Sequence, residues 1–253
     1  MTPSPDLAAA LEAAEAATRV IRAHYQRNIA VVLKADQSPV TAADVAAEQA
    51  IRAVLATRFP AHAFRGEETG RSGTGELLWL VDPIDGTKAF VRDYPMFSTQ
   101  IALMRADELV LGVSCAPLYG ELAWAQRGAG AWLNDRPLHV SLIDRLAAAT
   151  VSSGNLKSLA AGPRWSRYGA LVARVDRSRG YGDFLHYHLL AAGKIDAVLE
   201  TDVNILDIAA LVTIVEEAGG RFTDLDGRPV GLATTTVLAS NGALHGALLD
   251  ALA

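Results

Sequence analysis

The chain has 253 residues, a length that fits one large domain or two smaller ones that share a core. Apolar residues make up 51% of it and charged residues 20%, which excludes a disordered chain, and a net charge of −5 argues against binding a nucleic-acid polymer. A single cysteine, Cys115, excludes an intrachain disulfide, and the sequence shows neither a secretory signal nor an apolar run of roughly 20 residues. We therefore expect a soluble cytoplasmic protein without a membrane partner.

The first half of the chain predicts two long helices followed by a sheet. Ser4 and Pro5 form a helix start, and apolar residues at three-to-four spacing continue to Tyr25. Thr41 begins a second helix, which Pro60 ends. Turns at hairpin distance separate the later β runs, so most of this sheet should be antiparallel; the runs cover residues 77–81, 98–104, 109–117, 121–126 and 129–133.

The second half alternates between the two kinds of element. We expect strands at residues 151–153, 195–200, 221–223 and 236–240, and helices at residues 165–175, 183–192, 206–218 and 244–252. Residues 71–75 predict a mobile loop, and residues 142–148 a boundary. The pattern predicts a layered α/β protein of the α+β type, in which an N-terminal half (1–140) and a C-terminal half (141–253) form one compact unit.

Two aspartates follow a strongly apolar strand. Residues 78–81 read Leu-Trp-Leu-Val, and Asp82 and Asp85 come directly after them, separated by a turn that Pro83 fixes. Other acidic residues lie at the ends of predicted elements, where side chains can converge on one cleft: Glu67, Glu68 and Asp207. Carboxylates packed together would repel one another without a cation, and oxygen ligands select hard ions such as Mg²⁺.

Local explanations that need no metal also exist. Asp-Pro and Asp-Gly pairs are common in turns, and Asp85 can cap a short helix that begins at Gly86. If that helix forms, the free N–H groups of its first turn, including that of Thr87, can hold phosphate oxygens. Asp44, three residues after Thr41, has the spacing of a capping box, and the local sequence favours this structural role.

The histidines do not predict a zinc site. His186 and His188 are two residues apart in a predicted helix and therefore point in different directions. The other four have no partner at ligand spacing: His24, His62, His139 and His245. We interpret all six as structural or surface residues.

Taken together, the acidic motifs resemble the inositol monophosphatase family. Residues 66–69 (Gly-Glu-Glu-Thr) resemble its first acidic motif, residues 82–87 (Asp-Pro-Ile-Asp-Gly-Thr) its signature loop, and residues 206–210 with 216–220 its C-terminal motif. The match spans nearly the whole chain. It implies an αβαβα sandwich, dependence on Mg²⁺ with two or three ions per site, and a homodimer that hydrolyses a small-molecule phosphate ester.

The resemblance also implies roles for single residues. One metal would be held by Glu67, Asp82 and the carbonyl oxygen of Ile84, and a second by Asp82, Asp85 and Asp207. The attacking water would be held and deprotonated by Thr87 and Asp44, with Glu68 near the metals or acting through a water molecule. Phosphate would bind to the backbone N–H groups of Gly86 and Thr87. The implied role of Asp44 replaces the purely structural one that the local sequence favours.

A segment before the predicted helix at residue 183 bears on the substrate. Gly182, Asp183 and Phe184, with the run at residues 85–90, resemble the histidinol-phosphatase branch of the family, whereas inositol-type members have small neutral residues at position 183. Histidinol phosphate carries an ammonium group and an imidazole, so carboxylates at Asp183 and Glu200 would favour it over a neutral polyol. The alternative is that Asp183 only caps the helix. Leu206 departs from the tryptophan that is common in the family, which changes the packing of the pocket.

Three functional interpretations follow. The first is the Mg²⁺-dependent hydrolysis of L-histidinol phosphate, a reaction of histidine biosynthesis. The second keeps the chemistry but changes the ester to myo-inositol 1-phosphate or a nucleotide-derived phosphate. The third is a non-catalytic relative that binds a phosphorylated metabolite, and the presence of every predicted ligand and of the water-activating pair argues against it.

Overall fold

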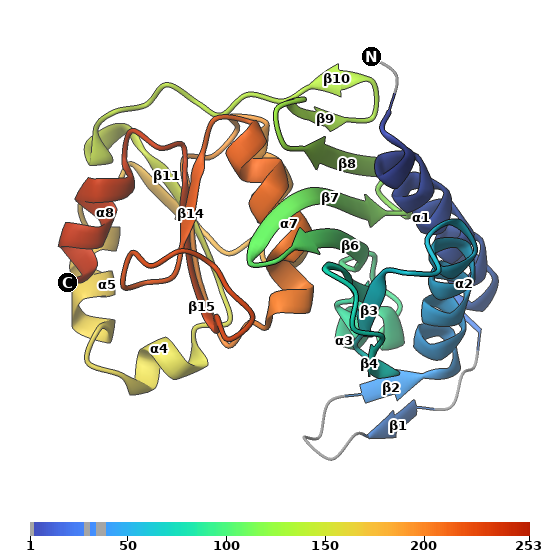
Figure 1. Ribbon diagram of the computed structural model, residues 1–253. Helices are drawn as coiled ribbons and strands as arrows, with labels where there is room; N and C mark the ends of the chain where they lie inside the picture. Colours follow the sequence, from blue (N-terminus) through green and yellow to red (C-terminus); the bar gives the residue numbers. More distant parts are fainter. Residues whose placement is uncertain (1–2, 28–30, 34–38) are drawn as a thin grey trace.

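The computed structural model describes residues 3–27, 31–33 and 39–253. In this part of the chain two sheets stand beside each other, with helices between them and on both outer faces (Figure 1). None of its helices combines the length and the apolar character needed to cross a membrane.

Two helices form the first layer, α1 (Pro5–His24) and α2 (Ala42–Arg58). Ser4 caps α1 by accepting a hydrogen bond from the N–H of Leu7 at 3.2 Å, as its sequence predicts. Thr41 and Asp44 form the capping box of α2. Both helices pack with the first sheet into one hydrophobic cluster, and the buried face of α1 is made largely of alanine.

The first sheet has eight strands in the described residues, in the spatial order β10-β9-β8-β7-β6-β5-β3-β4. Every neighbouring pair is antiparallel except β3 with β5, which confirms the prediction of a largely antiparallel sheet. The strand bounds are β3 (Ala63–Gly66), β4 (Gly70–Ser72), β5 (Leu77–Asp85), β6 (Ser98–Arg105), β7 (Glu108–Ala116), β8 (Glu121–Gln126), β9 (Ala131–Leu133) and β10 (Arg136–Pro137).

Four short strands before β5 are not predicted by the sequence pattern. β3 was expected as a connecting segment, and β4 takes in the start of the loop expected at residues 71–75, because both gain their hydrogen bonds from the sheet edge and not from a local pattern. A separate antiparallel pair precedes α2, made of β1 (Val31–Leu33) and β2 (Pro39–Thr41). Each of these strands has only three or four residues, too few to show alternation.

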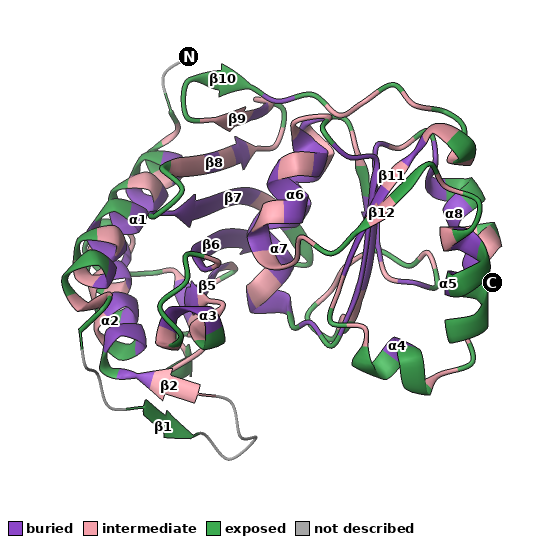
Figure 2. Ribbon diagram, turned by 180° about the vertical axis from the view of Figure 1, so that it is seen from behind, coloured by how far each residue is buried: buried purple, intermediate pink, exposed green. Residues whose placement is uncertain are grey.

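The strand β5 lies inside the first sheet and leads directly into the acidic loop. Its inner residues are buried because helices cover both faces of the sheet, as Figure 2 shows for the purple strands. Its pairing with β6 shifts register between Asp82 and Asp85, where the carbonyl of Pro83 accepts a hydrogen bond from the hydroxyl of Thr99 at 2.8 Å. The short helix α3 (Thr87–Val91) begins two residues after Asp85.

The middle layer consists of α6 (Asp183–Ala191) and α7 (Ile205–Glu217), which lie between the two sheets (Figures 1 and 2). α7 is buried along almost its whole length. It rests directly on β7, because a methyl group added to Gly112 would overlap the carbonyl oxygen of Ala210. The largest hydrophobic cluster forms around these two helices and joins both sheets.

The second sheet has five strands in the order β12-β11-β13-β15-β14. It is mixed, since β11 is parallel to β12 and β13, whereas β15 is antiparallel to β13 and β14. The bounds are β11 (Thr150–Gly154), β12 (Arg177–Arg179), β13 (Ala197–Thr201), β14 (Arg221–Thr223) and β15 (Thr236–Ser240).

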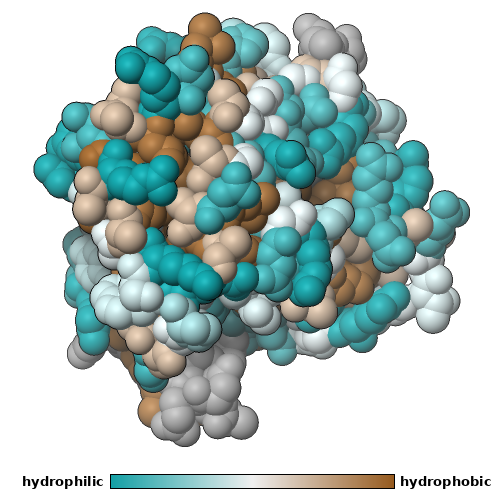
Figure 3. Space-filling view, turned by 90° about the vertical axis from the view of Figure 1, so that its left-hand side faces the viewer, coloured by the Kyte–Doolittle hydropathy of each residue, from teal (hydrophilic) through white to brown (hydrophobic). Residues whose placement is uncertain are grey.

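The last layer covers the outer face of the second sheet. It contains α5 (Trp165–Val172) and α8 (His245–Leu252), with α4 (Lys157–Ala161) and the 3₁₀ turn η1 (Leu146–Ala148) nearby. α5 ends three residues earlier than expected, and neither α4 nor β12 was predicted. Figure 3 views the molecule from this side, where hydrophobic side chains lie among hydrophilic ones.

The layer order helix, sheet, helix, sheet, helix confirms the αβαβα sandwich. Strands of the first sheet fall between residues 63 and 137 and those of the second between 150 and 240. The division of the chain into halves at residue 140 stays a prediction. Residues at the end of β5, directly after β3 and in the first turn of α7 line one cavity together with Asn155 and Asp183.

Candidate active site

Four acidic side chains from three elements meet at one end of the first sheet. β3 and β5 are parallel neighbours, and the N–H of Glu67 donates to the carbonyl of Val81 at 3.1 Å, which places Glu67 beside Asp82. One carboxylate oxygen each of Asp82, Asp85 and Asp207 lies within 4.8 Å of the others. Opposite ligands of a bound Mg²⁺ are about 4.2 Å apart, so a small adjustment of these side chains would let all three oxygens share one cation.

The electrostatics of this cluster favour a bound cation. Burial, followed by repulsion from Glu67 and Asp85, raises the pKa of Asp82 well above its usual value. Burial and the charges of Asp183 and Asp207 do the same to the pKa of Asp85. Carboxylates that resist ionisation because they face one another need a compensating positive charge to be stable at neutral pH. An all-oxygen donor set with surplus negative charge fits a hard divalent ion.

Asp207 is held in place by the start of its own helix. Its two carboxylate oxygens accept hydrogen bonds from the backbone N–H of Asn204 at 2.8 Å and from the side-chain amide of Asn204 at 2.6 Å. Burial raises the pKa of Asp207 to about 7, with repulsion from Glu67 and Glu200 adding to it and the Asn204 hydrogen bonds opposing it. The capping box of α7 therefore fixes this carboxylate at the cluster.

Asp44 and Thr87 form a hydrogen-bonded pair next to the cluster. The hydroxyl of Thr87 lies 3.2 Å from Oδ1 of Asp44 and 3.1 Å from the carbonyl oxygen of Ile84. The other carboxylate oxygen of Asp44 accepts two hydrogen bonds from Thr41, so the residue caps α2 and also faces the site. Burial raises the pKa of Asp44, and its hydrogen bonds to Thr41 and Thr87 partly oppose this.

Glu48 is a site residue that the sequence analysis missed. It is fully buried one turn after Asp44 on α2, and its carboxylate accepts the backbone N–H groups of Glu68 at 2.7 Å and of Thr69 at 2.9 Å. These bonds hold the loop that carries Glu67. Gly66 has no room for a side chain, since an added methyl would overlap the Glu48 carboxylate. The i, i+4 spacing of Asp44 and Glu48 indicates two acids on one face of α2, but it does not indicate which loop Glu48 holds.

An open cavity of about 410 Å³ lies over the cluster. Its volume falls in the usual range for small-molecule sites. Predicted residues line it, including Gly86, whose φ of +93° and closeness to the carbonyl of Met96 leave room only for glycine. Residues that the sequence did not single out line it as well: Pro39, Lys88, Ala89, Tyr94 and Asn155.

A small inner cavity of about 20 Å³ adjoins the open one and shares four of its lining residues, Asp85, Asn155, Asp183 and Asp207. Tyr187 on α6 and Glu200 on β13 line it as well. Burial, followed by repulsion from Glu200, raises the pKa of Asp183 to about 6. Asp183 has a φ of +45° and follows Gly182, whose φ is +74°, so the chain enters α6 through two left-handed residues.

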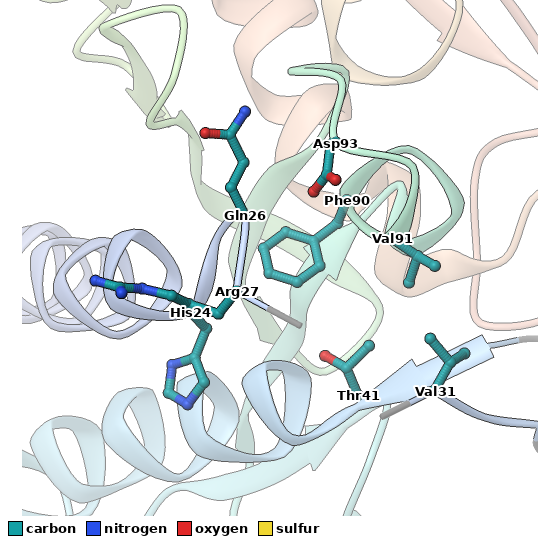
Figure 4. A pocket seen from close by; sticks show the side chains of 8 residues that line it. All are labelled: His24, Gln26, Arg27, Val31, Thr41, Phe90, Val91 and Asp93. Atoms are coloured by element: carbon teal, nitrogen blue, oxygen red, sulfur yellow. The ribbon is translucent and has the colours of Figure 1, made fainter. Parts of the chain in front are cut away.

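A further cavity of about 270 Å³ is lined by Thr41 and by residues outside the site (Figure 4). Its side chains come from the end of α1, from β1 and β2 and from α3. It contains none of the predicted site residues, and Thr41 connects it to Asp44.

Comparisons with known proteins agree with this geometry. A model of the inositol monophosphatase family matches residues 2–253. The histidinol-phosphatase of Streptomyces coelicolor is 41% identical over 231 residues, covering 88% of this chain and 86% of that protein. The histidinol-phosphatase of Mycobacterium tuberculosis is 39% identical over 254 residues, covering 98% and 97%. An inositol-1-monophosphatase of Mesorhizobium japonicum is 35% identical over 231 residues, covering 89% and 86%.

Solved structures share the fold. The extragenic suppressor protein suhB of Bartonella henselae is 32% identical and gives a TM-score of 0.91, with 98% of each chain covered. The inositol monophosphatase of Anabaena is also 32% identical and gives a TM-score of 0.85, with 97% of this chain and 94% of that one covered. The chain belongs to the inositol monophosphatase family.

Proposed function

We propose that the chain is a Mg²⁺-dependent phosphatase whose substrate is L-histidinol phosphate. One observation carries the choice of substrate: Asp183 and Glu200 line the inner cavity beside Asp85 and Asp207. Metal ions would balance the charge of Asp85 and Asp207, which leaves two carboxylates for a positive group of the substrate. The relatives named histidinol-phosphatases support this choice.

The sizes of the two cavities match the parts of this ester. A space of roughly 10–15 Å³ holds one water molecule, so the inner cavity of about 20 Å³ suits a group as small as an ammonium. The open cavity, about 410 Å³, has room for the imidazole and the phosphate. We therefore place the ammonium between Asp183 and Glu200. A neutral polyol offers no charge to these carboxylates.

The metal ions would be held by side chains and one carbonyl that the structure brings to the open cavity: Glu67, Asp82, Ile84, Asp85 and Asp207. The family resemblance supports two or three Mg²⁺ ions at this place. Bound divalent ions lower the pKa of a water molecule and neutralise charge on phosphoryl oxygens.

The chain's own groups position the water and the phosphate. Thr87 can donate its hydroxyl hydrogen to Asp44 and accept a hydrogen from water with a lone pair. Asp44 can take up the proton, because burial raises its pKa toward the working range of a general base. We place the phosphate on the N–H groups of Gly86 and Thr87, with the exposed Lys88 adding positive charge at the cavity mouth. Glu68 would act beside the metals or through a water molecule.

Other parts of the proposal rest on the family resemblance and on composition. We propose a homodimer that acts in the reducing cytoplasm, in a step of histidine biosynthesis. The alternative substrate is myo-inositol 1-phosphate, which the relatives named inositol-1-monophosphatases favour. A nucleotide-derived phosphate is a further candidate with the same chemistry.

Steady-state phosphate release from a panel of esters tests the proposal. With Mg²⁺, we expect kcat/KM for histidinol phosphate to exceed that for myo-inositol 1-phosphate by about tenfold or more. Asp183→Asn should lower the first value by about 10- to 100-fold and the second by less than about threefold, since only the cation loses a charged partner. Asp202→Asn, which removes an exposed charge outside both cavities, is the matched control. Equal wild-type values for the two esters would contradict the substrate choice.

A further inference from the structure

Glu200 is oriented by two neighbouring side chains of α6. Nε2 of His186 lies 3.1 Å from Oε2 of Glu200, and the hydroxyl of Tyr187 donates to the same oxygen at 2.8 Å. All three side chains are buried, and that of His186 is fully inaccessible. Burial and the charge of Glu200 raise the pKa of Tyr187 well above its usual value, so Tyr187 remains a donor at neutral pH. Two donors on one oxygen fix the rotation of the carboxylate.

The other carboxylate oxygen of Glu200, Oε1, points toward Gly154. A methyl group added to Gly154 would come within 2.5 Å of Oε1 of Glu200 and 3.4 Å of Cε1 of His186. The glycine at the end of β11 therefore leaves space for this carboxylate in its present orientation. Oε2 is engaged by both donors, and the carboxylate held in this way lines the inner cavity.

A hydrogen-bonded chain extends from His186 to the segment that presents Asp183. Nδ1 of His186 lies 3.4 Å from the hydroxyl oxygen of Ser152, which also accepts the backbone N–H of Tyr181 at 3.2 Å. Every group has a partner if Ser152 donates to Nδ1 and Nε2–H of His186 donates to Glu200. Tyr181 stands two residues before Asp183, so one chain of bonds positions both carboxylates of the inner cavity.

We propose that His186 is a positioning residue that sets the preference for a substrate with a cationic alcohol part. This inference rests on the proposed function. His186 lines neither cavity of the site, and its hydrogen bonds go to Glu200 and Ser152 and not to Asp82, Asp85 or Asp207, nor to Asp44 or Thr87, within the described residues. It acts through Glu200 and Ser152, and so it affects the binding of the positive group and leaves the chemical step unchanged.

A merely structural role for His186 predicts a different result. In that case its loss would weaken the protein and lower the activity on every ester to the same extent. His188 provides the matched comparison, because it is buried on the same helix and makes two hydrogen bonds, to Glu121 at 2.8 Å and to Ser114 at 2.9 Å. Those partners belong to the first sheet and lie outside both cavities.

The experiment measures kcat and KM of the full chain with Mg²⁺ for histidinol phosphate and for myo-inositol 1-phosphate. For His186→Leu we expect KM for histidinol phosphate to rise by about 10- to 100-fold, with kcat changed less than about threefold and the neutral ester little affected. His186→Gln, whose amide can donate to Glu200, should restore most of the preference. His188→Leu should change both esters by the same factor.

Further variants keep the test decisive if His186→Leu fails to fold. Tyr187→Phe removes the second donor to Oε2, and Ser152→Ala breaks the bond to Nδ1 of His186. Both should shift the preference in the same direction by a smaller factor. An equal loss on both esters in these variants, or a failure of His186→Gln to restore the preference, overturns the role of His186 alone. A wild-type protein that does not favour histidinol phosphate overturns the proposed function and this inference together.

Discussion

The carboxylate cluster should make the metal-free protein lose stability as the pH rises. Burial and neighbouring acids raise the pKa of Asp207 from 3.8 to about 7. Between these values the folded chain keeps a proton that the unfolded chain releases, so the free energy of unfolding falls through this window and levels off above it. Each pKa unit corresponds to ~1.4 kcal/mol, so ionising Asp207 without a metal destabilises the fold by about 4 kcal/mol.

His245 acts in the opposite direction and has to be separated from this effect. Burial, followed by the charge of Arg221, lowers the pKa of His245 from 6.5 to about 4. Its contribution to stability is present above pH 6.5 and is lost as the pH falls to about 4. We therefore compare the wild type with Asp207→Asn, which removes the charge but keeps an acceptor for Asn204. Asp250→Asn, an exposed position on α8, serves as the control.

Urea unfolding in EDTA from about pH 4.5 to about pH 8, repeated with Mg²⁺, measures the effect. Relative to Asp207→Asn, the wild type should lose about 3 kcal/mol across this range, because the range begins above the unfolded pKa of 3.8, whereas its difference from Asp250→Asn should stay constant within about 0.5 kcal/mol. Mg²⁺ at 100 times its Kd should add back about 2.7 kcal/mol at the upper pH. Parallel curves for the wild type and Asp207→Asn in EDTA would refute the reasoning, as would a stability that Mg²⁺ does not change.

Three other results are expected. Thr87→Ala should lower kcat about 100-fold or more with KM changed only a few-fold, because it removes the group that orients the water; steady-state phosphate release measures this. Gly112→Ala should lower the free energy of unfolding by about 1–3 kcal/mol, since a methyl overlaps α7, whereas Gly169→Ala on the exposed face of α5 should be neutral or stabilising by about 1 kcal/mol. KM for histidinol phosphate should rise more steeply than KM for myo-inositol 1-phosphate as the pH falls below about 6, because Asp183 takes up a proton there, whereas protonation of the phosphate is common to both esters.

The sequence indicates that Asp82, Asp85 and Asp207 lie at element ends because local structure places each of these three acids, and their role as metal ligands stays a prediction. Asp82 and Asp85 follow a strand whose apolar run is unmistakable, and Asp207 sits in the first turn of a strongly apolar helix. The capping box at Thr41 and Asp44 also forms as the spacing indicates. The same Asp44 also contacts Thr87, 43 residues away, and only the folded chain shows that one carboxylate makes both sets of hydrogen bonds.

Residues that act through distant partners could not be found in this way. Glu48 holds the Glu67 loop from another element, and nothing in its own helix indicates that loop. His186 and His188 do point in different directions, as predicted, but the sequence does not indicate their partners. His186 is hydrogen-bonded to Glu200 on the second sheet, and His188 to Ser114 on the first. Such pairings depend on how α6 packs between the sheets, which local patterns do not specify.

A crystal structure of the protein with Mn²⁺ and L-histidinol would test the proposed metal ligands and the proposed substrate together. We predict anomalous peaks within ligand distance of Asp82, Asp85 and Asp207, and the ammonium of histidinol within hydrogen-bond distance of Asp183 and Glu200. Metal peaks away from these three carboxylates, or an ammonium that faces solvent while the inner cavity stays unused, would contradict the proposed chemistry and the proposed substrate respectively.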